Sequence, residues 1–171
     1  YYFDLYGRAE AIRILLIAAK VPFEDVRVEV DKWPAWKQEH LEVMEWGQLP
    51  VLEHEGRRLN QYSAIMAYLG RLYGYYPSDP FEAWRVDSLI EAVTDFRQAL
   101  VKVKYEDDPE KQKELLQNFV DNILPTSLRG IDKRLAENSN PNFAVGDKLT
   151  VADFHLASVI YALFLNDLYE H

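Results

Sequence analysis

The hydrophobic pattern of this chain changes character once, and that change limits the possible folds more than any other feature. Before residue 74, apolar runs with strand spacing and helix spacing alternate in the order β-α-β-α-β-β-α. Residues 74–80 contain one glycine and two prolines and show no period. Every strong pattern after them has helical spacing. The sequence therefore predicts an α/β domain over residues 1–75 and an all-helical domain over residues 81–171.

The strands of the first domain are predicted at residues 1–3, 26–30, 50–53 and 57–60. In the second of these, Val26, Val28 and Val30 alternate with charged residues, which predicts one buried face. The helices of this domain are predicted at residues 8–19 and 33–40 and from residue 62 to about residue 72.

Two long helices are predicted in the second domain. Apolar residues from Val86 to Val103 share one face of the first. The second covers residues 109–138 with its apolar side chains facing inward, and Pro125 is expected to kink it because proline lacks the N–H of a regular helix.

A last helix, from Val151 to Leu165, is apolar nearly all round and is expected to be the buried centre of the helical domain. Thr150 and Asp153 have the spacing of a reciprocal capping box at its start. Asp153 is therefore given a structural role and no catalytic one.

Composition excludes several classes of partner. The net charge of −9 is unsuited to nucleic acid or an anionic membrane, so neither is expected to bind. Without cysteine the chain has no disulfide or thiolate nucleophile, and its four histidines show no shared-face spacing, so no metal is expected. No apolar run reaches the length of a membrane span, and the start lacks a signal-peptide pattern, which predicts a soluble intracellular protein.

A proline opens the third predicted strand, in the segment Leu49-Pro50-Val51-Leu52. Proline has no N–H and is tolerated at strand starts and sheet edges, so the backbone of Leu49 is expected to pair with something other than its own sheet. An extended peptide would fit such an edge. Tyr2 enters a turn before one helix and Gln61 precedes another. Together these segments predict a site for a small peptide that carries a thiol.

The order and separation of six short motifs are specific, although each motif alone is weak. They are Tyr2-Phe3, Gly7-Arg8-Ala9-Glu10, Trp33-Pro34, Gly47-Gln48-Leu49-Pro50-Val51-Leu52, Gln61 with Ala64-Ile65, and Gly146 with Thr150-Val151-Ala152-Asp153. Over almost its whole length the chain thereby resembles the cytosolic glutathione transferases, and the sigma class most closely. The resemblance implies a thioredoxin-like domain that binds glutathione, an all-helical domain that shapes the electrophile site, and a cytoplasmic homodimer.

The resemblance assigns catalysis to Tyr2 and an assisting role to Arg8. A free thiol has a pKa near ~8.5 and a phenol near ~10, so at neutral pH the phenol can donate a hydrogen bond to a thiolate without losing its proton. A strand-end aromatic that merely packs on the core is the alternative for Tyr2 taken alone.

Glutathione, as the co-substrate, would need partners for two carboxylates, an amine and two amides. The resemblance places these on Tyr2, Trp33, Lys37, Gln48, Leu49, Pro50, Gln61, Tyr62 and, from across the dimer, Asp95. Several of these residues also have an ordinary structural interpretation. Gln61 would be a helix cap, and Trp33 would be a packed loop aromatic. Lys37 and Asp95 would be solvated surface charges.

The chain departs from the family pattern in two places. Family members usually carry serine after the glutamine, and here that position is Tyr62. The chain also starts within the first strand and stops soon after the central helix, which points to missing segments. Leu5, Arg97 and His155 are candidates for lining the electrophile pocket, and each has an equally good packing or surface role.

The predicted activity is conjugation of glutathione to hydrophobic electrophiles in an apolar cleft. Two alternatives stay open. One is a glutathione-dependent isomerase of the prostaglandin type, and the other is a non-catalytic relative resembling a lens crystallin or a ligand carrier.

Overall fold

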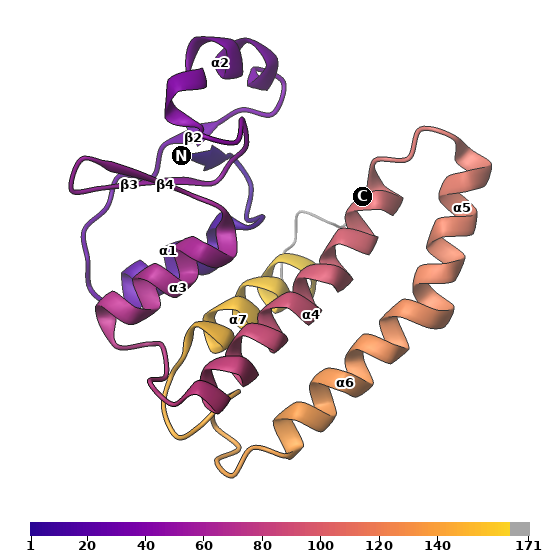
Figure 1. Ribbon diagram of the computed structural model, residues 1–171. Coiled ribbons are helices and arrows are strands. Elements are labelled where there is room, and N and C mark those ends of the chain that lie inside the picture. The colour runs from indigo at the N-terminus through magenta and orange to yellow at the C-terminus, as the bar shows by residue number, and fades with distance from the viewer. Residues whose placement is uncertain (165–171) are drawn as a thin grey trace. The chain divides into compact units, whose positions relative to one another are not determined.

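The computed structural model describes residues 1–164 and divides into two compact units (Figure 1). Of the described residues, 1–76 and 154–164 form the first unit, and 77–153 form the second. The predicted α/β part followed by a helical part is confirmed. The seven residues that end the predicted second domain lie outside the described residues.

The first unit has the predicted order of strands and helices. Its elements are β1 (Tyr2–Phe3), α1 (Ala9–Ala18), β2 (Arg27–Val28), α2 (Trp33–Glu39), the short 3-10 helix η1 (Leu41–Val43), β3 (Val51–His54), β4 (Arg57–Asn60) and α3 (Tyr62–Tyr73). Strand β1 pairs in parallel with β2, and β3 pairs antiparallel with β4. Tyr1 and Val51 exchange backbone hydrogen bonds of 2.8 and 3.1 Å, so the two strand pairs are joined side by side.

Strand β2 is shorter than the alternating valines predict. Only Arg27 and Val28 pair, because β1 offers two partners, Tyr2 and Phe3. Val28 is buried, whereas Val30 lies beyond the paired segment and is exposed. The prediction of a strand over residues 26–30 was therefore too long, since the length of a strand depends on its neighbour.

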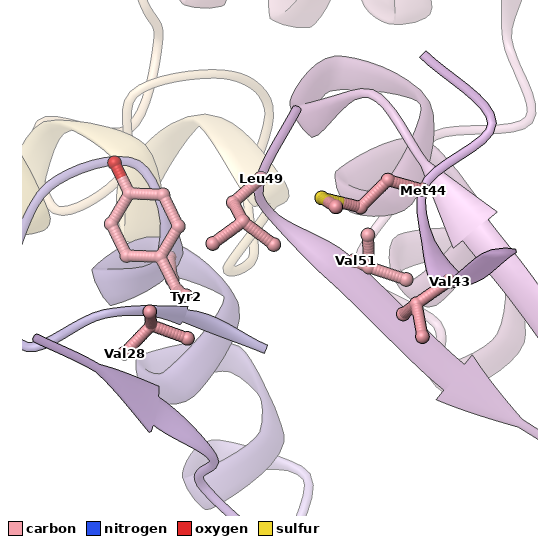
Figure 2. Close-up of a cluster of buried hydrophobic side chains, with 7 residues drawn as sticks. Tyr2, Val28, Val43, Met44, Leu49 and Val51 are labelled. Carbon is pink, nitrogen blue, oxygen red and sulfur yellow. The ribbon is translucent and has the colours of Figure 1, made fainter. Parts of the chain in front are cut away.

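A compact apolar cluster supports the start of the chain. Its buried members are Tyr2, Ala9, Val28, Val43, Met44, Leu49 and Val51. Figure 2 shows the ring of Tyr2 beside Val28 and Leu49, with the phenol oxygen pointing away from the other labelled side chains. Tyr2 thus fills a core position with its ring while its hydroxyl leaves the core.

The second unit is a helical hairpin. Helix α4 (Pro80–Lys104) lies alongside α5 (Pro109–Asn118), the π-helical turn η2 (Phe119–Ile123) and α6 (Leu124–Ala136) (Figure 1). Asp79 caps α4 by accepting from the backbone N–H groups of residues 81 and 82. Phe96 of α4 contacts Phe119, with ring centroids 5.3 Å apart.

The helix predicted over residues 109–138 is interrupted just before Pro125, as expected, but by a π-helical turn. Pro125 cannot donate the backbone hydrogen bond that an α-helix needs at this point. A π turn holds more residues than an α turn and rotates the following side chains. The prediction that this apolar set faces inward is only partly right, because Phe119 is buried whereas Val120 and Leu128 are exposed.

Helix α7 (Val151–Phe164) begins where the sequence predicts, and Leu165 lies outside the described residues. It is not buried all round, since Ile160 and Tyr161 are exposed. The capping box forms in one direction only. Asp153 accepts from both the N–H and the hydroxyl of Thr150, at 2.8 and 2.9 Å, so that hydroxyl acts as a donor instead of capping the helix.

Candidate functional site

The site starts at the Tyr2 hydroxyl, which the turn between β1 and α1 holds in place. The backbone N–H of Arg8 donates a hydrogen bond of 2.9 Å to the phenol oxygen. Because that oxygen is already an acceptor here, the proton of the phenol is directed toward another partner. The phenolic proton of Tyr2 is therefore available for donation to a further group.

Gly7 allows this arrangement. Its φ of +35° is in the left-handed region that side chains disfavour. A Cβ at this position would also collide with the hydroxyl and ring of Tyr2 and with Leu5. The turn can approach the Tyr2 ring this closely only with glycine at position 7.

A network of charged side chains around Arg13 also holds this turn. The buried guanidinium of Arg13 donates to the carbonyl of Leu5 at 3.1 Å and pairs with Glu10 at 3.0 Å and Asp25 at 3.1 Å. Arg27 also binds Asp25, at 2.8 Å. Burial by itself would raise the pKa of Asp25, but the hydrogen bonds from Arg27 and Arg13 outweigh it and lower that pKa. The carboxylate thus stays charged and holds both arginines.

A small pocket adjoins this turn and collects most of the predicted glutathione ligands. It is lined by Arg8, Trp46, Gln48, Leu49, Pro50, Asn60, Gln61 and Tyr62. The segment before β3 thus meets the start of α3 and the first residue of the turn. Trp46 and Asn60 were missed by the sequence analysis. Their positions directly before Gly47 and Gln61 are the only local signals that could have found them.

Tyr2 is not among the residues that line this pocket. Its hydroxyl is bonded to the backbone of Arg8, which does line it. It lines a different cavity of about 340 Å³, which is walled by α1, residues 21–26 and β3. The prolyl bond between Leu49 and Pro50 is cis, and β3 begins one residue later. Leu49 is buried and belongs to the apolar cluster.

Trp33 and Lys37 lie on α2, outside the set of residues that lines the pocket. The ring of Trp33 packs edge-on against Phe3, with centroids 5.1 Å apart. The Lys37 ammonium lies 5.6 Å from the centre of the Trp33 ring. A Cβ at Gly47 would lie 3.4 Å from that ammonium, so Lys37 reaches the loop that carries Gln48.

The start of α3 contains the departure from the family pattern. Gln61 has a φ of +69° and its side chain makes no capping hydrogen bond. Tyr62 is buried, and its hydroxyl shares a hydrogen bond with Nδ1 of His155 on α7. The Tyr62 hydroxyl therefore points into the interior, and His155 is 1% exposed.

The remaining predicted residues are spread over both units. Leu5 is half-buried and packs against the apolar cluster. Asp95 is exposed and Arg97 is half-buried, and both belong to α4 in the second unit. Among residues 1–164, no group of three or more potential metal ligands comes together. Within the same range, no helix has both the length and the apolar character needed to cross a membrane.

Two family models match the chain. Residues 1–71 match the glutathione S-transferase N-terminal domain, and residues 94–169 match a glutathione S-transferase C-terminal domain.

Curated relatives match over nearly the whole chain. A glutathione S-transferase of Anopheles gambiae is 33% identical over 94% of this chain and 76% of its own length. Glutathione S-transferase 4 of Caenorhabditis elegans is 34% identical over 96% of this chain and 79% of its own length. Glutathione S-transferase S1 of Drosophila melanogaster is 31% identical over 93% of this chain, which spans 61% of that relative.

Solved structures have the same fold. Prostaglandin synthase D of Nilaparvata lugens superposes with a TM-score of 0.83 at 31% identity, covering 93% of this chain and 77% of that one. A glutathione S-transferase of Necator americanus, Na-GST-3, described as monomeric, gives 0.80 at 30% identity, with 99% and 84% covered.

Proposed function

Since this chain belongs to the glutathione S-transferase family, we propose that it joins the sulfur of glutathione to hydrophobic, electrophilic small molecules. The observation that carries the proposal is the Tyr2 hydroxyl, which accepts from the Arg8 N–H and keeps its proton for a ligand. The pocket that begins at Arg8 contains Gln48, Leu49 and Gln61, which the resemblance assigns to glutathione.

In this mechanism, Tyr2 donates its phenolic proton as a hydrogen bond to the sulfur anion of glutathione. The thiol proton has passed to solvent, and the bond favours the ionised sulfur. Each unit by which the thiol pKa falls corresponds to about 1.36 kcal/mol, and a charge-assisted hydrogen bond with a nearby cation can supply it. The Arg8 N–H polarises the phenol, which strengthens its donation.

The sulfur then attacks an electrophilic carbon. A sulfur–carbon bond forms while the leaving group departs with its electron pair, and no bond to the enzyme is made. Orientation of the two reactants and stabilisation of the thiolate supply the rate enhancement.

Recognition of glutathione is assigned as the resemblance implies. The γ-glutamyl carboxylate binds at the start of α3, next to Gln61, where a helix N-terminus favours an anion. The exposed Gln61 makes no capping bond, which supports this assignment. The cysteinyl amide pairs with the backbone of Leu49, beside Gln48 and Pro50. Trp33 and Lys37 bind the glycyl carboxylate.

The remaining assignments belong to the same proposal. The chain is a sigma-class, cytoplasmic enzyme of detoxification, with domains over residues 1–75 and 81–171. It forms a homodimer in which Asp95 of one protomer reaches the glutamyl amine bound to the other. The exposure of Asp95 supports this role. The resemblance also assigns Leu5, Arg97 and His155 to the electrophile pocket.

A prostaglandin-type isomerase is the second candidate, because prostaglandin synthase D of Nilaparvata lugens has a closely similar structure. Here the same thiolate would act on an endoperoxide. Turnover of an endoperoxide substrate that exceeds turnover of an aryl halide would favour this activity over general conjugation.

The deciding experiment compares Tyr2→Phe with Tyr1→Phe. The hydroxyl of Tyr1 binds Glu53 at 2.8 Å on the exposed side, so its loss is a matched control for removing a neighbouring phenol. We expect the Tyr2 variant to lose nearly all conjugation of glutathione to an aryl halide while still binding to a glutathione resin. Equal activity in both variants would remove Tyr2 from the mechanism.

An ultraviolet titration of the bound thiol gives an independent measurement. In the wild-type protein the thiol pKa should lie well below its value in free glutathione, and in Tyr2→Phe it should return toward that value. An unshifted thiol pKa in the wild type would favour a non-catalytic ligand carrier.

A further inference from the structure

Tyr62 is the one buried residue among the first three positions of α3. Tyr62 is 5% exposed, whereas Gln61, Ser63 and Ala64 around it are exposed. Gln61 before it has a positive φ and provides no side-chain cap. Ile65 and Met66 hold the end of this turn, and Tyr62 holds its first residue.

His155 holds the far end of the Tyr62 side chain. The phenol oxygen and Nδ1 of His155 are hydrogen-bonded, and the two rings lie 5.2 Å apart. His155 is almost completely buried. Its own backbone carbonyl accepts a hydrogen bond of 2.7 Å from the Ser158 hydroxyl, one turn later on α7. The partner of Tyr62 is thus anchored in a helix whose inner face is packed.

Tyr62 also lines the pocket with Arg8, Leu49 and Gln61. The same residue is bonded through its hydroxyl to His155 on α7. Helix N-termini bind anions through their first N–H groups, whose direction follows the backbone of this turn. A shift of the Tyr62 ring would therefore move those donors relative to a bound carboxylate.

We propose that the hydrogen bond between Tyr62 and His155 positions the first turn of α3 for the γ-glutamyl carboxylate of glutathione. The inference rests on the proposed function. In this chain Tyr62, bonded to His155, stands at the position after the glutamine where the family usually carries serine. Tyr62 and His155 are positioning residues, and their side chains do not touch the reacting sulfur.

The test uses Tyr62→Phe and a matched control on the same helix. Tyr68 of α3 makes the same kind of bond, 2.9 Å to Nδ1 of His54, and does not line the pocket. We expect Tyr62→Phe to raise the KM for glutathione about threefold to tenfold, as loss of one hydrogen bond implies. Its kcat at saturating glutathione and its KM for the electrophile should stay within about twofold of wild type. Tyr68→Phe should leave all three parameters unchanged.

Two substitutions of His155 separate positioning from general loss of stability. Asparagine places an amide near the position of Nδ1, and glutamine places it near Nε2. His155→Asn should therefore keep the KM for glutathione near that of wild type, and His155→Gln should raise it as Tyr62→Phe does. Calorimetric binding of glutathione to each folded variant provides the same comparison without turnover.

The outcomes are distinguishable. A wild-type protein that neither binds glutathione nor conjugates it would overturn the proposed function and this inference with it. Glutathione binding in the wild type combined with equal KM values in Tyr62→Phe and Tyr68→Phe would overturn the positioning role alone. A KM for the electrophile that rises as much as that for glutathione would also overturn it, because the effect would not be confined to the start of α3.

Discussion

Replacing Gly7 with alanine tests how the turn over Tyr2 works. Gly7 has a φ of +35°, and an added Cβ would collide with the Tyr2 hydroxyl and ring. Left-handed backbone costs an alanine about 1–2 kcal/mol, and the clash adds about 1–3 kcal/mol. Loss of the bond from Arg8 to Tyr2 adds about 1 kcal/mol. Together these principles predict destabilisation by about 3–6 kcal/mol.

Gly56→Ala and Gly74→Ala are the matched controls. Both glycines have φ above +70°, and an added Cβ would meet nothing within 4 Å at either position. These variants should lose only the backbone contribution, about 1–2 kcal/mol, and should keep full activity per folded molecule. The difference between Gly7→Ala and the controls isolates the contact with Tyr2.

Urea unfolding and conjugation assays measure the two effects separately. A ring displaced by about 1 Å is expected to reduce kcat/KM about a hundredfold in the folded fraction of Gly7→Ala. If Gly7→Ala were as stable and as active as Gly56→Ala, the turn would not position the Tyr2 hydroxyl, and this reasoning would be wrong.

Two further predictions concern stability. Asp153→Ala removes the acceptor of three hydrogen bonds, two of them from Thr150, and should destabilise the protein by about 2–4 kcal/mol with unchanged activity per folded molecule; a denaturation midpoint equal to wild type would contradict this. Asp25 has a lowered pKa in the folded protein, so its stabilising contribution is present above the unfolded pKa of about 3.9 and is lost as the pH falls through the folded value. The difference in Tm between wild type and Asp25→Asn should therefore shrink below about pH 4. A difference that stays constant from pH 7 to pH 3 would show that the ion pairs of Asp25 with Arg13 and Arg27 do not stabilise the fold.

Local sequence patterns predicted the elements better than their lengths. The alternating valines identified β2, but its length is set by the two residues of β1 that pair with it. Pro125 marked the interruption between α5 and α6. No local sequence signal shows that the π turn rotates the side chains that follow it. None shows how narrow a face of each helix a two-helix hairpin can bury. Val120 and Leu128 were therefore predicted to face inward, and both are exposed.

The candidate site shows the same limit. The motifs around Arg8, Leu49 and Gln61 were each visible in the sequence, and the structure brings them to one pocket. The bond between Tyr62 and His155 was not visible, because the two residues are 93 positions apart. Their contact depends on how α3 and α7 pack, which neither helix encodes alone.

The ring of Tyr2 packs in one cluster with Val28 and Leu49. The direction of the phenol oxygen is therefore set by the volumes of these buried aliphatic side chains. On the proposed mechanism, conservative replacements of those side chains would reduce catalysis more than they reduce stability. A library of conservative replacements at these two positions should therefore lose turnover at substitutions that thermal melts barely register, and natural selection on the chemistry would keep this small patch of interior nearly constant.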